Sequence, residues 1–227
     1  MRNQTLALAA ITLLLCGTAC KKDEAPPPPD LGHAYFPSVA GQWAEYDVDT
    51  AWRNDVTGVT GNAQYQLREE LTNDFTDAGG RTAQRLLRSM RDTATGAWMP
   101  KDVWWQMRDG NQAERAEENQ RRIKLIFPPR TNQYWNTNAP NAGQPYELTY
   151  AEVDVPWEVN GMHFDSTVLV RTTYPNNAVV SNIYYERYAK HVGLVYRQVD
   201  STNTQMPGGV PKVRGTWYKQ VITGYGR

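Results

Sequence analysis

Cysteine and histidine are scarce in this sequence of 227 residues. The two cysteines are Cys16 and Cys20, and the three histidines are His33, His163 and His191. The histidines lack the His-x-His and His-Glu-x-x-His spacings of zinc sites, so we predict no metal site. Because no cysteine follows Cys20, the later sequence excludes an internal disulfide and, if Cys20 is modified, a cysteine nucleophile.

An excess of charge of one sign is also absent. The 24 lysines and arginines equal the 24 aspartates and glutamates in number, and 23 against 24 remain after residue 19. Nucleic-acid binding draws most of its affinity from basic side chains that neutralise phosphates. We therefore predict no nucleic-acid partner.

Motifs of enzymes and of cofactor-binding proteins are missing as well. The sequence has no Gly-x-Ser-x-Gly elbow, phosphate-binding loop or dinucleotide fingerprint. His163, Asp165 and Ser166 are the residue types of a hydrolase triad, but they fall within four positions, whereas triad members converge from separate elements. We therefore assign no catalytic residue and no cofactor.

The one continuous apolar run lies at the start of the chain. Arg2 precedes ten mainly apolar residues, 6–15. This run is too short to span a bilayer, which requires about 20 apolar residues. A positive residue followed by a short apolar run is typical of a secretory signal peptide, which we predict over residues 1–19.

Cys20 follows two small residues, and this stretch resembles a bacterial lipobox. It departs from the usual pattern at Gly17, where leucine is usual, and Cys16 is a poorer candidate because Leu15 directly precedes it. We predict cleavage before Cys20 and its acylation, for example with palmitate, which would anchor the mature chain in a membrane. Cleavage that leaves a free secreted protein is the alternative.

Residues 20–34 are charged and rich in proline, which is typical of a tether. The run Pro26–Pro29 favours a semi-rigid polyproline II spacer of about 3 Å per residue. Lys22-Asp23-Glu24 resembles a signal that carries lipoproteins of some Gram-negative bacteria to the outer face of the outer membrane. We predict a lipid-anchored outer-membrane protein, exposed at the cell surface or on the periplasmic face.

The sequence after this tether is patterned for β-strands. In residues 43–52, Tyr46, Val48 and Trp52 alternate with acidic residues, the period of a half-buried strand. Asn160-Gly161 is typical of a type I′ hairpin turn. Further strands are expected near residues 61–71, 101–108, 122–127, 165–174, 179–188, 192–199 and 213–225. We predict one mainly β domain over 35–227: an antiparallel curled sheet, a sandwich or a soluble half-barrel, with little helix.

Residues 81–91 allow two interpretations. Ala83, Leu86, Leu87 and Met90 recur at the spacing of an amphipathic helix. Gly79-Gly80 directly before them favours a hairpin turn that follows a strand. We predict a strand, with a helix as the alternative.

Short aromatic stretches resemble a group of uncharacterised secreted and lipid-anchored bacterial proteins. Residues 35–46 resemble the opening of that group, residues 125–128 and 134–136 its middle, and residues 186–196 a later segment. The chain departs from the group at Ser38, where an aliphatic residue is commoner, and at His191, where glycine is commoner. The resemblance implies a mostly antiparallel β domain and implies no activity.

Aromatic side chains are the remaining functional signal. Eight tryptophans and thirteen tyrosines stand against four phenylalanines, and each tryptophan or tyrosine combines an apolar face with a polar group. Such rings can stack on sugars or acyl chains, so we predict a non-enzymatic binding module for a glycan or hydrophobic ligand. Packing in the core is the alternative role. The candidate ligand-binding residues are Trp98, Trp104, Tyr134, Trp135 and Trp157.

Two other functions stay open. The absence of site chemistry is compatible with a structural or assembly subunit that has an envelope-protein partner. A carbohydrate-active hydrolase is a further alternative, which requires two carboxylates flanking one bond. Neighbouring pairs such as Glu69 with Glu70, or Glu117 with Glu118, would point to opposite faces of a strand, so such a site would have to form through the fold.

Overall fold

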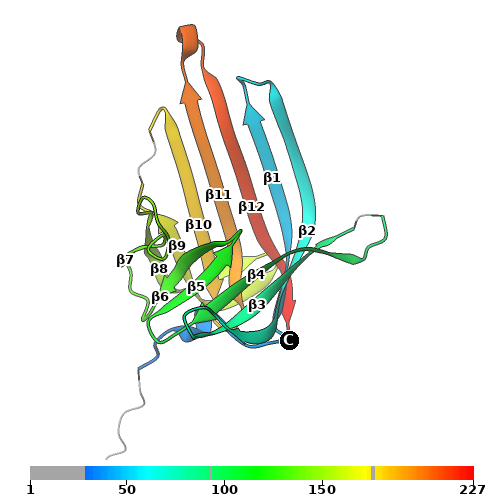
Figure 1. The fold of residues 1–227 in the computed structure, drawn as a ribbon, viewed down its shortest axis with the longest axis vertical. Coiled ribbons are helices and arrows are strands. Elements are labelled where there is room, and N and C mark those ends of the chain that lie inside the picture. Colours follow the sequence, from blue (N-terminus) through cyan, green and yellow to red (C-terminus); the bar gives the residue numbers. More distant parts are fainter. Residues whose placement is uncertain (1–28, 93, 175–176) are drawn as a thin grey trace, which may run out of the picture.

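A computed structural model describes residues 29–92, 94–174 and 177–227 (Figure 1). The predicted signal peptide, Cys20 and most of the tether lie outside the described residues. Within these ranges, the regular structure is antiparallel β-sheet with two short 3-10 helices, η1 (His33–Tyr35) and η2 (Pro207–Gly209). No helix in this part of the chain is both long enough and apolar enough to cross a bilayer.

Twelve strands form a single sheet in the order β6-β5-β4-β3-β2-β1-β12-β11-β10-β9-β8-β7. Strands that follow one another in sequence are therefore neighbours in the sheet, except β6 and β7, which are its two edges, and the first strand pairs with the last. The strands are β1 (Trp43–Asn54), β2 (Val59–Thr76), β3 (Thr82–Arg91), β4 (Trp98–Arg108), β5 (Gln112–Glu117), β6 (Gln120–Ile126), β7 (Tyr134–Asn136), β8 (Glu147–Val159), β9 (Met162–Thr172), β10 (Val180–Ala189), β11 (Gly193–Gln205) and β12 (Lys212–Gly226).

The sheet curls until its two edges, β6 and β7, almost meet, which gives a nearly closed, barrel-like shape. The Ile123 backbone N–H donates to the Thr137 carbonyl at 3.0 Å, and the Trp135 indole N–H donates to the Ile123 carbonyl at 3.0 Å. The Tyr150 hydroxyl bonds to both the N–H and the carbonyl of Ile126, at 3.0 and 2.7 Å. Side chains therefore replace much of a regular strand ladder at this seam.

Curling gives the sheet an inner face, which is the face on which Tyr46 and Val48 are buried. In β1 these two side chains are 2% and 1% exposed, whereas the alternating Asp47 and Asp49 are exposed. The period-two pattern thus separates inside from outside, as expected for a strand that is solvated on one face. Strands β10, β11, β12, β1 and β2 extend beyond the shorter strands β3 to β6 (Figure 1).

The mainly β prediction is confirmed, and of the three predicted forms the chain takes the curled single sheet. Residues 82–91 form β3, so the strand was the correct interpretation of that ambiguous segment. Asn160 and Gly161 have φ angles of 50° and 73°, as a type I′ turn requires, and they connect β8 to β9.

Two of the stretches that carried the family resemblance pack together at one end of the sheet, which we call the closed end. The Phe36 and Tyr188 rings lie 6.1 Å apart, and the His191 N–H donates to the Ala34 carbonyl at 2.7 Å. Gly193 has a φ of +94°, and a Cβ built there would lie 3.1 Å from Pro37. A side chain at this position would combine backbone strain with a tight contact.

His191 also occupies the left-handed region, with a φ of 66°, in the turn between β10 and β11. We expect His191→Gly to raise the free energy of unfolding by about 0.5–1 kcal/mol, because glycine tolerates this conformation. His191→Ala keeps the Cβ and should give no gain. Urea denaturation of the two variants measures the difference, and a destabilised His191→Gly protein would contradict this account.

Candidate functional site

The inner face of the sheet holds a largely buried cluster of four charges, Glu117, Lys124, Glu186 and Arg197, which we call the ion quartet. Lys124 Nζ lies 2.7 Å from Glu117 and 2.9 Å from Glu186. Arg197 lies 2.9 Å from Glu117 and 3.4 Å from Glu186. The Tyr188 hydroxyl donates to Glu186 at 2.6 Å. Two positive and two negative charges thus balance within one network.

Only the curling of the sheet brings these four residues together. Glu117 ends β5 and Lys124 lies in β6, near one edge of the sheet, while Glu186 and Arg197 are directly opposed on β10 and β11. A second buried group follows the inner face toward β2, where Glu69 accepts from Arg88 and Arg115, each at 3.0 Å.

Both carboxyl groups of the quartet are held ionised. Burial by itself would raise the pKa of Glu117, but Arg197 and Lys124 hold that pKa well below its usual value. Burial likewise opposes ionisation of Glu186, and Lys124 and Arg197 keep its pKa low. A glycosidase general acid needs the opposite, a carboxyl group that retains its proton near neutral pH. The quartet does not supply such an acid.

Loss of one quartet member should be costly, because its partners remain buried without full compensation. We expect Glu186→Gln to lower the free energy of unfolding at pH 7 by about 3 kcal/mol. Glu158→Gln, at an exposed position of β8, is the matched control and should change it little. Denaturant titration of both variants measures the effect, and equal stabilities would contradict a structural role for the quartet.

The lowered pKa values also predict a pH dependence. A carboxyl whose folded pKa lies below its unfolded value stabilises the fold above the unfolded value, and this contribution is lost as pH falls toward the folded pKa. The unfolding free energy should therefore fall as pH drops below the ordinary glutamate value of 4.5. The fall should be shallower in Glu186→Gln than in the unaltered chain, and parallel curves would count against this assignment.

A pocket of about 800 Å³ opens on the inner face beside the quartet, and we call it the inner pocket. Tyr146, Tyr174 and Tyr184 line it, with the Tyr146 ring 5.4 Å from that of Tyr174 and 6.1 Å from that of Tyr184. Side-chain amides and charges form most of the rest of the lining, with Thr137, Pro145 and Val199. The amides and charges include Glu117, Glu118, Arg122, Lys124, Asn138, Gln144 and Arg197.

The inner pocket lies away from the closed end. The β10–β11 turn is at the closed end, where Lys190 Nζ lies 3.2 Å from Asp30 in the last part of the tether. Asn182, which lines the inner pocket, precedes Ala189 by seven residues on β10. At 3.3 Å per residue, this separation is about 23 Å along the strand, and the nearer lining residue Tyr184 is about 17 Å from Ala189.

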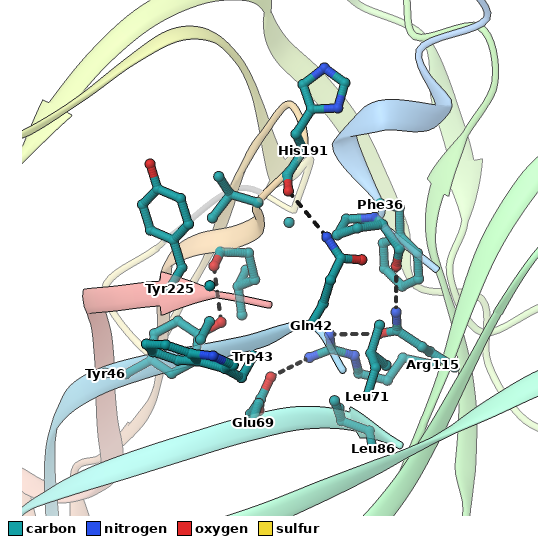
Figure 2. A pocket seen from close by; sticks show the side chains of 17 residues that line it. Phe36, Gln42, Trp43, Tyr46, Glu69, Leu71, Leu86, Arg115, His191 and Tyr225 are labelled. Atoms are coloured by element: carbon teal, nitrogen blue, oxygen red, sulfur yellow. Dashed lines mark hydrogen bonds and ion pairs between the residues drawn. The ribbon is translucent and has the colours of Figure 1, made fainter. Parts of the chain in front are cut away.

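A second pocket lies at the closed end itself (Figure 2). In Figure 2, Gln42 reaches toward His191 and Arg115 toward Glu69, and all four residues line this space. Its volume is about 50 Å³, which has room for only a few water molecules. Among the described residues, Gln42 Oε1 and Arg115 Nε are buried without a partner. Water suits this space better than a larger ligand.

Two of the five aromatic residues proposed from sequence are buried in separate places. Trp104 is 8% exposed, with the Arg88 guanidinium 3.6 Å above its ring, so it packs against the second charge group. Trp135 is also 8% exposed, and its indole N–H is bonded at the β6–β7 seam.

The other three lie apart from one another. Trp157 in the β8–β9 hairpin packs against the Tyr196 ring at 5.8 Å, Trp98 begins β4, and Tyr134 in β7 is 60% exposed. The structure therefore does not bring the five rings around one pocket, and a binding role for any of them stays a prediction. Sequence reasoning missed the tyrosines of the inner pocket because they come from three separate segments that share no motif.

No family model and no curated protein matches this chain. Among solved structures, a candidate lipoprotein from Parabacteroides distasonis is similar over 85% of this chain and 98% of its own, with a TM-score of 0.44 and 11% sequence identity. A likeness this distant establishes neither a family nor a function.

Proposed function

We propose that this protein is a lipid-anchored component of a Gram-negative outer membrane that binds a saccharide in its inner pocket without transforming it. The observation that carries the proposal is the lining of that pocket, where three tyrosines stand beside amide and charged side chains. Tyrosine faces stack on the apolar faces of sugar rings, and amides bond to hydroxyl groups. The volume of about 800 Å³ falls in the usual range for ligand sites.

The same lining disfavours an acyl chain as ligand. Arg122, Lys124 and Arg197 all line the pocket, together with Glu117. An acyl chain would remove water from these polar groups without offering them hydrogen bonds, which costs free energy. A hydroxylated ligand can replace the water that it displaces.

The anchor in this proposal rests on Cys20, the short apolar run before it and the proline-rich tether after it. We expect Cys20→Ser to abolish incorporation of labelled palmitate and to release the chain from the membrane fraction, because the acyl chains supply the attachment. Cys16→Ser is the matched control and should leave both unchanged. Labelling that follows Cys16 instead of Cys20 would contradict the proposed cleavage site.

Binding is tested with the full chain purified in detergent, first on a glycan array and then by calorimetry with the saccharides that bind. We expect Tyr146→Ala to weaken binding about tenfold, equivalent to about 1.4 kcal/mol, because a stacking face is lost. Tyr225→Ala removes a tyrosine that is 46% exposed outside the inner pocket and should have no effect. An array without any bound saccharide would overturn the proposal.

A further inference from the structure

Arg122 differs from the other cations of the inner pocket. Lys124 and Arg197 both pair with the carboxylates of the quartet. The ion pairs found among the described residues do not include Arg122. The other carboxylate of the lining, Glu118, is exposed in the β5–β6 turn and accepts from the Trp104 indole N–H at 3.4 Å. The Arg122 guanidinium therefore faces the pocket with its charge uncompensated by an acidic partner.

The Arg122 side chain is nevertheless held in place. Its guanidinium donates to the Asn138 amide oxygen at 2.6 Å and to the Gln120 amide oxygen at 2.5 Å. Asn138 is itself fixed, because it accepts from Asn141 at 2.9 Å and donates to the Gln144 carbonyl at 2.8 Å. These two acceptors use two of the five N–H groups of the guanidinium, so donors remain for a ligand.

Neutral acceptors fix the direction of a guanidinium without neutralising it. An arginine ordered in this way loses little conformational entropy when a ligand binds, and its planar fork suits the two oxygens of a carboxylate. Arg122 shares the pocket lining with Tyr146, Tyr174 and Tyr184, so a stacking surface and an anion-binding group lie in one space.

We propose that the inner pocket takes an acidic saccharide, with the carboxylate of a uronic acid on Arg122 and the sugar rings against the tyrosines. This inference rests on the proposed function and narrows its ligand class. A sulfated sugar offers a related anion, but the flat fork of the guanidinium matches a planar carboxylate better.

The test compares uronic-acid oligomers with their methyl esters, which keep the size and lose the charge. With the full chain in detergent, we expect oligogalacturonate, oligoglucuronate or oligomannuronate to bind at least tenfold more tightly than the corresponding ester. Arg122→Gln should remove that preference, and Arg122→Lys should restore it in part because it keeps the charge but not the fork. Added salt should weaken acid binding and leave ester binding unchanged.

Arg91→Gln is the matched control, because Arg91 also donates to an amide oxygen, that of Gln66, but lies outside the inner pocket. It should leave the preference intact. Equal binding of acid and ester would overturn this inference while leaving saccharide binding in place. Sulfated oligomers that bind as tightly as uronates would overturn the choice of carboxylate. Failure of every neutral, acidic and sulfated saccharide would overturn the proposed function itself.

Discussion

Lys124 lies between Glu117 and Glu186, and this contact joins strands that are far apart in the order of the sheet. A flatter sheet would separate β5 and β6 from β10 and β11 and leave these charges with fewer partners. Buried charges tolerate such separation poorly, so the ion quartet favours one curvature over others. The seam and the inner pocket also depend on that curvature, since each combines residues from the two ends of the strand order.

Buried charges also explain why strand β5 was not predicted from the sequence. Most strands were predictable from alternation, as β1 was from Tyr46 and Val48, and the β8–β9 turn was predictable from Asn160-Gly161. Strand β5 was not, because its sequence, Gln-Ala-Glu-Arg-Ala-Glu, places charged residues on both faces. Glu114 on one of these faces accepts from Arg81 and Arg121, at 2.8 and 2.6 Å. A strand stabilised by ion pairs on both faces has no hydrophobic period to detect.

The candidate site was less predictable than the fold, and for a different reason. Tryptophan content indicated rings available for a ligand, but much of that ring surface packs on the protein itself. Trp52 lies against Gly61, where a Cβ would come 2.4 Å from the ring, and Trp43 lies against Gly226 in the same manner. Such cross-strand pairs of tryptophan and glycine depend on the register between neighbouring strands, which the sequence alone does not give. Arg122 gave no signal because Asn138, the acceptor that holds it from another segment, follows it by 16 residues.

The inner pocket and the closed end are separated along the strands, and this separation affects how a ligand reaches the pocket. Lys190 fixes the last part of the tether at the closed end through Asp30, beside the β10–β11 turn. If the chain is anchored through Cys20, as proposed, the closed end would face the bilayer and the inner pocket would lie farther from it. A long polymer could then reach the pocket from the side without first entering the crowded, negatively charged layer of lipid headgroups. The height of the opening would thus admit ligands too large to approach the membrane surface closely.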